Sequence, residues 1–187
     1  MHLNSTVDEN KIDLNGYSFH KSNHPQDVKR GGVGLYVKES LPARRRPGLE
    51  AQPECVVCEI KLNRKKYFIA VLYRIPRQTQ VESEGFRKNF ELMLSKMSAE
   101  KPFSVIITGD FNCRSTQWWD GEFENEEGRI FEPFTADLGL NQLISEPTHI
   151  MGESKSCNDL VLRDQPNLFL ESSVHPPLDE LCHHHIT

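Results

Sequence analysis

The amino-acid sequence predicts an α/β protein with a mixed β-sheet, and three observations support this prediction. Apolar runs rich in β-branched residues recur at 33–39, 54–62, 67–73 and 103–107, and glycines or charged turns bound them. Between the last two runs, segment 83–97 repeats its apolar residues at helical spacing. The resulting order of strands and helix is typical of α/β proteins with mixed sheets.

The length and composition favour one domain, which we expect to span residues 1–187. The hydrophobic fraction is 37% and the charged fraction is 26%, as in globular proteins. No apolar run approaches the roughly 18 residues that cross a membrane, and the first eleven residues lack the features of a signal peptide. Five cysteines without framework spacing favour a reducing compartment. We therefore expect an intracellular protein with no membrane segment.

The charge of the chain limits how it could contact nucleic acid. A formal net charge of −5 excludes a polycation, so such a contact needs a local basic patch or a metal. Arg30 precedes two glycines at 31–32, whose spacing is only weak evidence for a phosphate cradle. Three arginines at 44–46 lie in a predicted loop, 39–53. They form either a solvated charge run, the favoured interpretation, or a contact to the DNA backbone.

The strands at 54–62 and 67–73 are predicted to form a hairpin, which the polar segment 63–66 closes. Cys55 and Cys58 occupy the first of these strands. Because side chains alternate along a strand, the two thiols face opposite sides of the sheet. No second C-x-x-C completes a zinc site, so we interpret both cysteines as core residues.

Two helices and one late strand complete the prediction. The first helix has Ser83 as its N-cap and one apolar face for the core, made of Phe86, Phe90, Met93, Leu94 and Met97. The second covers 128–139, with Pro133 in its first turn and a stop at Gly139. Its inward face is expected to hold Ile130, Phe131, Phe134 and Leu138. A strand is expected at 168–173.

The most informative polar residues follow the apolar run at 103–107. Asp110 and Asn112 come directly after Gly109, where the strand stops. A carboxylate there could orient or deprotonate a water or hold a metal, and the amide can donate and accept hydrogen bonds at a fixed place. The alternative is a simple Asx turn, since Asp and Asn favour loops for local reasons.

Further candidates lie at the ends of other segments. Tyr73 ends its strand, where its hydroxyl could reach a phosphate, although a core-edge role is the default. Trp118 and Trp119 lie in a polar loop. They could pack at the rim of the fold, which we slightly favour, or offer a stacking surface for bases. Asp159 opens an apolar strand near a sheet edge. The three histidines at 183–185 do not share one face, so they are not expected to form a tridentate metal site.

Five motifs occur in a fixed order: Y-R-x-P at 73–76, G-D-F-N at 109–112, E-P-T-H at 146–149, S-C-N-D-L-V-L at 156–162 and H-x-x-I at 183–186. Together they resemble the endonuclease/exonuclease/phosphatase superfamily. Within it, the chain resembles the apurinic/apyrimidinic-like endonuclease domain of non-LTR retrotransposons. The resemblance implies a four-layer α/β sandwich with two mixed β-sheets flanked by helices, here without the first strands.

The resemblance also implies a role for each matching residue. Asp110 matches the residue that orients or deprotonates the attacking water, and Asn112 its partner on the phosphate and metal side. Tyr73 matches a tyrosine that contacts the scissile phosphate. Asp159 matches the aspartate hydrogen-bonded to the catalytic histidine, and His183 matches that histidine, with His184 as the alternative.

The implied DNA contacts and metal follow from the same positions. Thr148, Trp118 and Trp119 match positions near the DNA groove, and Arg114 and Arg30 are the basic residues we assign to the same contact. The implied cofactor is Mg²⁺ or Mn²⁺, held by Asp110 and Asn112. The implied partners are DNA and a reverse transcriptase domain in the full element, and the implied location is the nucleus if the chain is active.

One departure from the family pattern bears on activity. The family's main metal-binding glutamate, within an E-T-like motif, has no counterpart here, and Asp8 and Glu9 match the loop beyond it. Because Mg²⁺ commonly uses one or two carboxylates, losing the main one should weaken its binding severely. We therefore expect a truncated Mg²⁺-dependent phosphodiester hydrolase that is impaired as written. The alternatives are an inactive DNA-binding remnant and another phosphatase of the superfamily.

Overall fold

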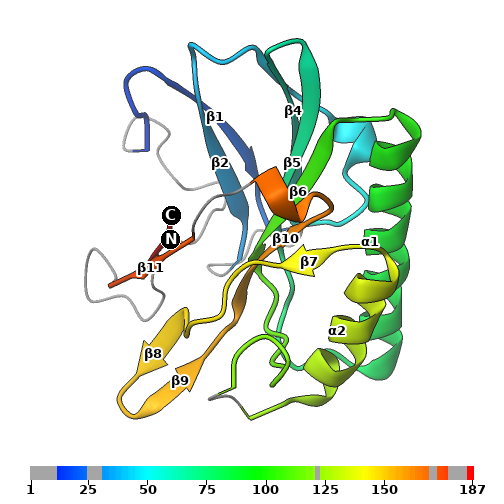
Figure 1. Cartoon of the computed structure of the whole chain (residues 1–187), viewed down its shortest axis with the longest axis vertical. Coiled ribbons are helices and arrows are strands. Elements are labelled where there is room, and N and C mark those ends of the chain that lie inside the picture. The colour runs from blue at the N-terminus through cyan, green and yellow to red at the C-terminus, as the bar shows by residue number, and fades with distance from the viewer. Residues whose placement is uncertain (1–11, 25–30, 121–122, 169–171, 177–184) are drawn as a thin grey trace. The chain divides into compact units, whose positions relative to one another are not determined.

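The computed structural model describes residues 12–24, 31–120, 123–168, 172–176 and 185–187 (Figure 1). Contacts divide the chain into two compact units, Met1–Ile107 and Thr108–Thr187. Strands and helices occur in both units, so the predicted α/β class is confirmed. Within these described segments, no helix is long and apolar enough to cross a membrane.

The sheet of the first unit is built around a long antiparallel hairpin. Hydrogen bonds join β3 (Ala43–Arg45), β4 (Cys55–Leu62), β5 (Lys65–Tyr73) and β6 (Ser104–Asp110), in that order. The β4–β5 turn contains Asn63 and Arg64, at φ values of 49° and 64°, and Leu62 pairs with Lys65. A two-residue turn with both φ values positive fits the twist of a hairpin, so the predicted hairpin is confirmed.

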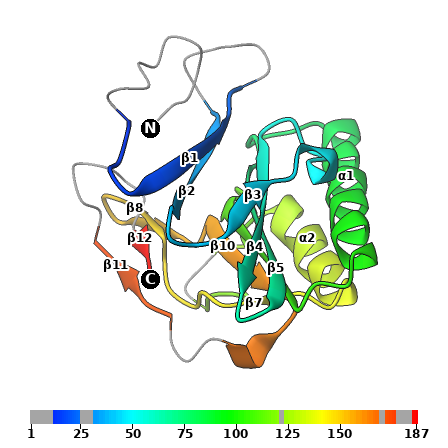
Figure 2. The ribbon, with the colours of Figure 1, turned by 90° about the horizontal axis from the view of Figure 1, so that it is seen from above.

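Strand β4 is buried on both of its faces. One face packs on the hairpin of β1 (Tyr17–Ser22) and β2 (Val33–Lys38), where Cys58 joins the apolar cluster. On the other face, the Cys55 sulfur lies 3.6 Å from the Met93 sulfur of helix α1 (Gln80–Ala99). Figure 2 shows α1 and the β1–β2 hairpin on opposite sides of β4 and β5. Both thiols are therefore core residues on opposite faces, as predicted.

Helix α1 begins earlier than the sequence prediction placed it. Thr79, not Ser83, is the N-cap: its side chain accepts the Glu82 N–H, and the Glu82 carboxylate accepts the Thr79 N–H at 2.8 Å. This reciprocal capping box satisfies two backbone donors at once, which explains why the helix extends to Thr79. Ser83 instead accepts a hydrogen bond from the Arg74 guanidinium at 2.9 Å. The predicted apolar face is buried in full.

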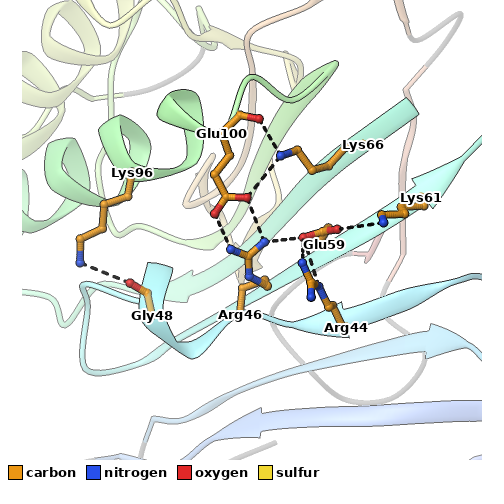
Figure 3. Close-up of polar contacts among 8 residues, drawn as sticks. All are labelled: Arg44, Arg46, Gly48, Glu59, Lys61, Lys66, Lys96 and Glu100. Carbon is orange, nitrogen blue, oxygen red and sulfur yellow. Dashed lines mark hydrogen bonds and ion pairs between the residues drawn. The ribbon is translucent and has the colours of Figure 1, made fainter. Parts of the chain in front are cut away.

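Segment 39–53 is not a loop throughout, because β3 and the short 3-10 helix η2 (Pro47–Leu49) lie within it. All three of its arginines are ion-paired inside the chain. Arg44 and Arg46 bind the Glu59 carboxylate, and Arg45 binds Glu50 at 2.8 Å (Figure 3 for the first two). The Arg44–Glu59 pair joins β3 to β4, and the Arg44 side chain is still 66% exposed, as the favoured solvated run predicts. The side chains of Arg45 and Arg46 are only 32% and 21% exposed and are held in ion pairs, so the solvated run does not describe these two residues.

The second unit contains the end of β6, helix α2 (Glu126–Asp137) and a set of short strands. These strands are β7 (Asn141–Gln142), β8 (His149–Met151), β9 (Ser154–Ser156), β10 (Asp159–Arg163), β11 (Val174–His175) and β12 (His185–Ile186). Strand β10 lies between β6 and β7 in the sheet. Two antiparallel pairs, β8–β9 and β11–β12, stand apart from that sheet.

Three predictions in the second unit need correction. Ile130 of α2 is exposed, whereas Phe131 is buried. The helix begins at Glu126, two residues before the predicted start, with Asn125 as its N-cap. The strand predicted at 168–173 does not include Leu168, which ends the 3-10 helix η3 (Pro166–Leu168). Residues 169–171 lie outside the described part of the chain.

Candidate active site

The second unit holds a polar turn where β6 ends. Asp110 is the last residue of β6, and its Oδ1 accepts the Asn112 N–H at 3.1 Å. Asn112 has a left-handed backbone, with φ of 50°. Phe111 between them is fully buried, and its ring centroid lies 5.4 Å from that of Phe131. The turn is therefore an Asx turn, as the alternative interpretation held. Phe111 is buried, whereas Asp110 and Asn112 on either side of it are partly exposed.

A second chain segment lies beside this turn. The Phe111 N–H donates to the Asn158 carbonyl at 2.9 Å, directly before β10 begins at Asp159. The Thr148 hydroxyl oxygen accepts the N–H groups of Asn158 and Asp159, at 3.1 and 3.0 Å. Thr148 is fully buried, and its oxygen satisfies two backbone donors. Asp159 is thus fixed next to the Asp110 turn.

Arg114 joins the same group of residues. Its Nε lies 3.4 Å from the Asn158 Oδ1, and its backbone N–H donates to the Asn125 side chain at 2.9 Å. The structure therefore brings Asp110, Asn112, Arg114, Thr148 and Asp159 together. Asn158 and Asn125 are additional members that we did not assign from the sequence. An asparagine three residues before Gly128 and ahead of a helix is an N-cap signal that could have identified Asn125.

Trp118 and Trp119 lie in a turn that follows Arg114. The backbone N–H groups of both residues donate to the Ser115 carbonyl, at 3.1 and 3.4 Å. Both side chains are half-buried. A half-buried indole can pack at a rim and present a face to a base, so stacking on DNA stays a prediction.

Tyr73 belongs to the first unit, at the end of β5. Its N–H donates to the Glu54 carbonyl at 3.1 Å. Its side chain is half-buried and lines a cavity of about 490 Å³ that Phe86 and Gln78 also line. The other assigned residues, Arg30 and His183 with its alternative His184, lie outside the described part of the chain.

The donor set of the turn partly fits a magnesium ion. Mg²⁺ prefers oxygen ligands and commonly takes one or two carboxylates together with waters and phosphate oxygens. Asp110 offers a carboxylate and Asn112 an amide oxygen from one turn. Among the described residues, no group of three or more His, Cys, Asp or Glu side chains could hold a metal. A magnesium ion at this turn would therefore need water and phosphate oxygens as further ligands, and metal binding stays a prediction.

Comparisons with known proteins place this fold within a class of α/β proteins. The endonuclease domain of TRAS1, a telomere-specific non-LTR retrotransposon, superposes with a TM-score of 0.76 at 21% identity, covering 92% of this chain and 79% of that one. The 3′ phosphatase NExo from Neisseria, in a structure bound to a product DNA hairpin, gives a TM-score of 0.64 at 12% identity. It covers 98% of this chain and 83% of that chain. These likenesses define the fold as that of the endonuclease/exonuclease/phosphatase superfamily.

The sequence identifies the family within that class. The family model described as endonuclease-reverse transcriptase matches residues 67–185, so the chain belongs to this family. The RNA-directed DNA polymerase from the mobile element jockey of Drosophila funebris is 24% identical over 141 residues, which cover 74% of this chain. The chain spans only 14% of that relative's length. Family membership supports a nuclease-type function and the retrotransposon resemblance.

Proposed function

We propose that this chain is a phosphodiester hydrolase that nicks DNA with the help of Mg²⁺ or Mn²⁺. The observation that carries the proposal is the Asp110–Asn112 turn, which hydrogen bonds hold beside Asp159 and Arg114. A carboxylate, an amide and a guanidinium at one place can orient a water and bind a phosphate. The endonuclease family match supports this chemistry.

In the proposed reaction, water adds to phosphorus, the P–O bond to one sugar breaks, and the released sugar oxygen takes a proton from solvent. Asp110 orients the water and accepts its proton, while the Asn112 amide donates to a phosphate oxygen. Arg114 supplies positive charge, and Thr148 fixes the backbone that carries Asp159. Asp110 and Asn112 would hold the metal, which polarises the phosphate and lowers the pKa of a bound water. Tyr73 and His183 keep the phosphate-binding roles that the resemblance implies.

We also propose that metal binding is weak and turnover slow. The turn contributes one carboxylate, Asp110, whereas two carboxylates are common in tighter Mg²⁺ sites. Activity should therefore rise through the millimolar range of Mg²⁺ instead of saturating at micromolar concentrations. Because the family joins an endonuclease to a reverse transcriptase, we propose a reverse transcriptase as the partner. A chromosomal DNA substrate would place this action in the nucleus.

A plasmid-nicking assay tests the proposal. We expect the wild-type chain to convert supercoiled plasmid to nicked circles with Mg²⁺ and not with EDTA. Asp110→Ala should lower the rate by about 100-fold or more, because it removes the group that orients the water. Asp137→Ala, at an exposed position near the end of α2, is the matched control and should cleave like the wild type.

The same assay separates hydrolysis from DNA binding alone. A binding remnant would retain DNA on a filter in a salt-dependent way, without Mg²⁺ and without nicking. Retention without any Asp110-dependent cleavage would contradict the proposed function.

A further inference from the structure

We propose that Asn125 is a positioning residue that fixes the backbone of Asn112 and Arg114 in the geometry that hydrolysis needs. The inference rests on the proposed function, since it assigns a role to the turn that carries Asp110. Asn125 lies one residue before helix α2 and touches neither metal nor substrate in the proposed reaction.

The carboxamide of Asn125 connects two parts of the second unit. Its Oδ1 accepts the Gly128 N–H at 2.7 Å, which caps α2, and also the Arg114 N–H at 2.9 Å. Its Nδ2 donates to the Asn112 carbonyl at 3.0 Å. Its backbone N–H donates to the Arg114 carbonyl at 3.1 Å. Three of these four bonds go to residues 112–114, so helix capping accounts for only one of them.

The backbone of Asn112 has a conformation that needs hydrogen bonds to hold it. Its φ of 50° lies in the left-handed region, which asparagine tolerates better than most residues but still at a cost. The Asp110 carboxylate fixes its N–H, and Asn125 fixes its carbonyl. The peptide units on both sides of the Asn112 Cα are therefore held, which sets the direction of its Cα–Cβ bond.

Gly128 brings the helix close enough for this contact. A Cβ at position 128 would lie 1.7 Å from the Arg114 carbonyl oxygen and 2.2 Å from its carbonyl carbon. No side chain fits at that distance, so the first turn of α2 lies directly against the Arg114 backbone. The Arg114 Nε donates to the Asn158 Oδ1, and the Asn158 backbone N–H donates to the Thr148 hydroxyl oxygen. Asn125 thus stands at one end of a continuous set of contacts that reaches the β10 segment.

Substitutions at position 125 can separate positioning from capping. Ser and Asp cap helices about as well as Asn, so Asn125→Ser and Asn125→Asp should keep α2 formed. Aspartate has no donor group, and the single O–H of serine is one atom closer to the backbone than the Asn125 Nδ2, so neither variant reproduces the bond to the Asn112 carbonyl. We expect both variants to melt near the wild type, with kcat lowered about 10-fold or more and KM changed less than about 3-fold.

Thr79→Ala is the matched control, because it removes the cap of α1 at a position outside the proposed site. It should lower the melting temperature and leave kcat unchanged. If Asn125→Ser and Asn125→Asp nick like the wild type, the positioning role is wrong. The same holds if they lose kcat only in proportion to lost folded protein.

Amide hydrogen exchange tests the positioning role without any activity measurement. In the wild type, the Arg114 N–H is bonded to the Asn125 side chain and should exchange slowly. In Asn125→Ser it should exchange about 10-fold or more faster, while amides in the middle of α2 keep their wild-type rates. Unchanged exchange at Arg114 would overturn the inference even if the wild type proved inactive. A wild type without Asp110-dependent cleavage, combined with faster Arg114 exchange, would instead reject the proposed function alone.

Discussion

At the scale of single residues, the candidate site depends on side chains that bind backbone groups. The Asp110 carboxylate accepts a backbone N–H two residues ahead, and the Thr148 hydroxyl accepts two such groups. Bonds of this kind fix the chain path, because a backbone group has no rotamers to average over. The residues proposed to act on the phosphate therefore rest on a rigid local frame.

Thr148→Val tests the importance of the buried hydroxyl for that frame. Valine keeps the shape but leaves the Asn158 and Asp159 N–H groups without their acceptor. We expect a loss of about 1–3 kcal/mol in the free energy of unfolding, measured by urea denaturation. Thr116→Val, at an exposed turn position, is the matched control and should change little. A loss below about 0.5 kcal/mol for Thr148→Val would show that water or another group replaces the hydroxyl.

The residues of the site differ in how far sequence alone could identify them. The Gly-Asp-Phe-Asn turn stands out because a β-branched strand leads directly into it, and that signal is local. Asn125 looks like an ordinary helix cap in the sequence. Its bonds to Asn112 and Arg114 depend on contacts across more than ten residues, which no local pattern encodes.

At the scale of elements, an ion-pair network joins β3, β4, β5 and the end of α1. Arg46 binds both Glu59 and Glu100, and Lys66 binds Glu100 at 3.2 Å (Figure 3). This network explains why the sequence did not predict a strand at β3. A three-residue strand with two arginines has no apolar pattern, and it forms because the buried Glu59 faces it from β4. The long hairpin of β4 and β5 has a strong alternating pattern, and it was predicted correctly.

The network predicts a specific dependence of stability on pH. Burial raises the pKa of Glu59, but the hydrogen bonds from Arg44 and Arg46 outweigh this effect and hold that pKa below its usual value. The hydrogen bond from Arg46 also lowers the pKa of Glu100. As the pH falls through about 4.3, these two carboxylates therefore take up protons in the unfolded chain before they do so in the folded chain. Stability from these groups is present above that pH and is lost below it.

Urea denaturation of variants between about pH 6 and pH 3 measures this effect. We expect Glu59→Gln to lose less unfolding free energy over this range than the wild type, by on the order of 1 kcal/mol. Glu91→Gln, at an exposed position of α1, should follow the wild-type curve. Parallel curves for Glu59→Gln and the wild type would contradict the assignment of the pH dependence to this network.

At the scale of the whole molecule, the expectations from the sequence and the structure agree on class and family. The α/β class and the retrotransposon endonuclease resemblance are confirmed. In the described part of the chain, four cysteines are free and buried, and the reducing compartment stays a prediction. Burial raises the pKa of Cys55 to about 12 and that of Cys58 to about 11, which keeps both thiols protonated and unreactive. The roles of Tyr73, Asp159 and His183 stay predictions.

We propose that the chain hydrolyses DNA at the Asp110–Asn112 turn, and cleavage in ¹⁸O-labelled water tests this claim most directly. A duplex oligonucleotide is cut with excess enzyme and Mg²⁺, and the products are weighed by mass spectrometry. The wild type should place one ¹⁸O on the phosphate at each cleaved bond, and Asp110→Ala should give no labelled product above background. Cleavage without ¹⁸O incorporation, or equal labelling by Asp110→Ala, would contradict the claim.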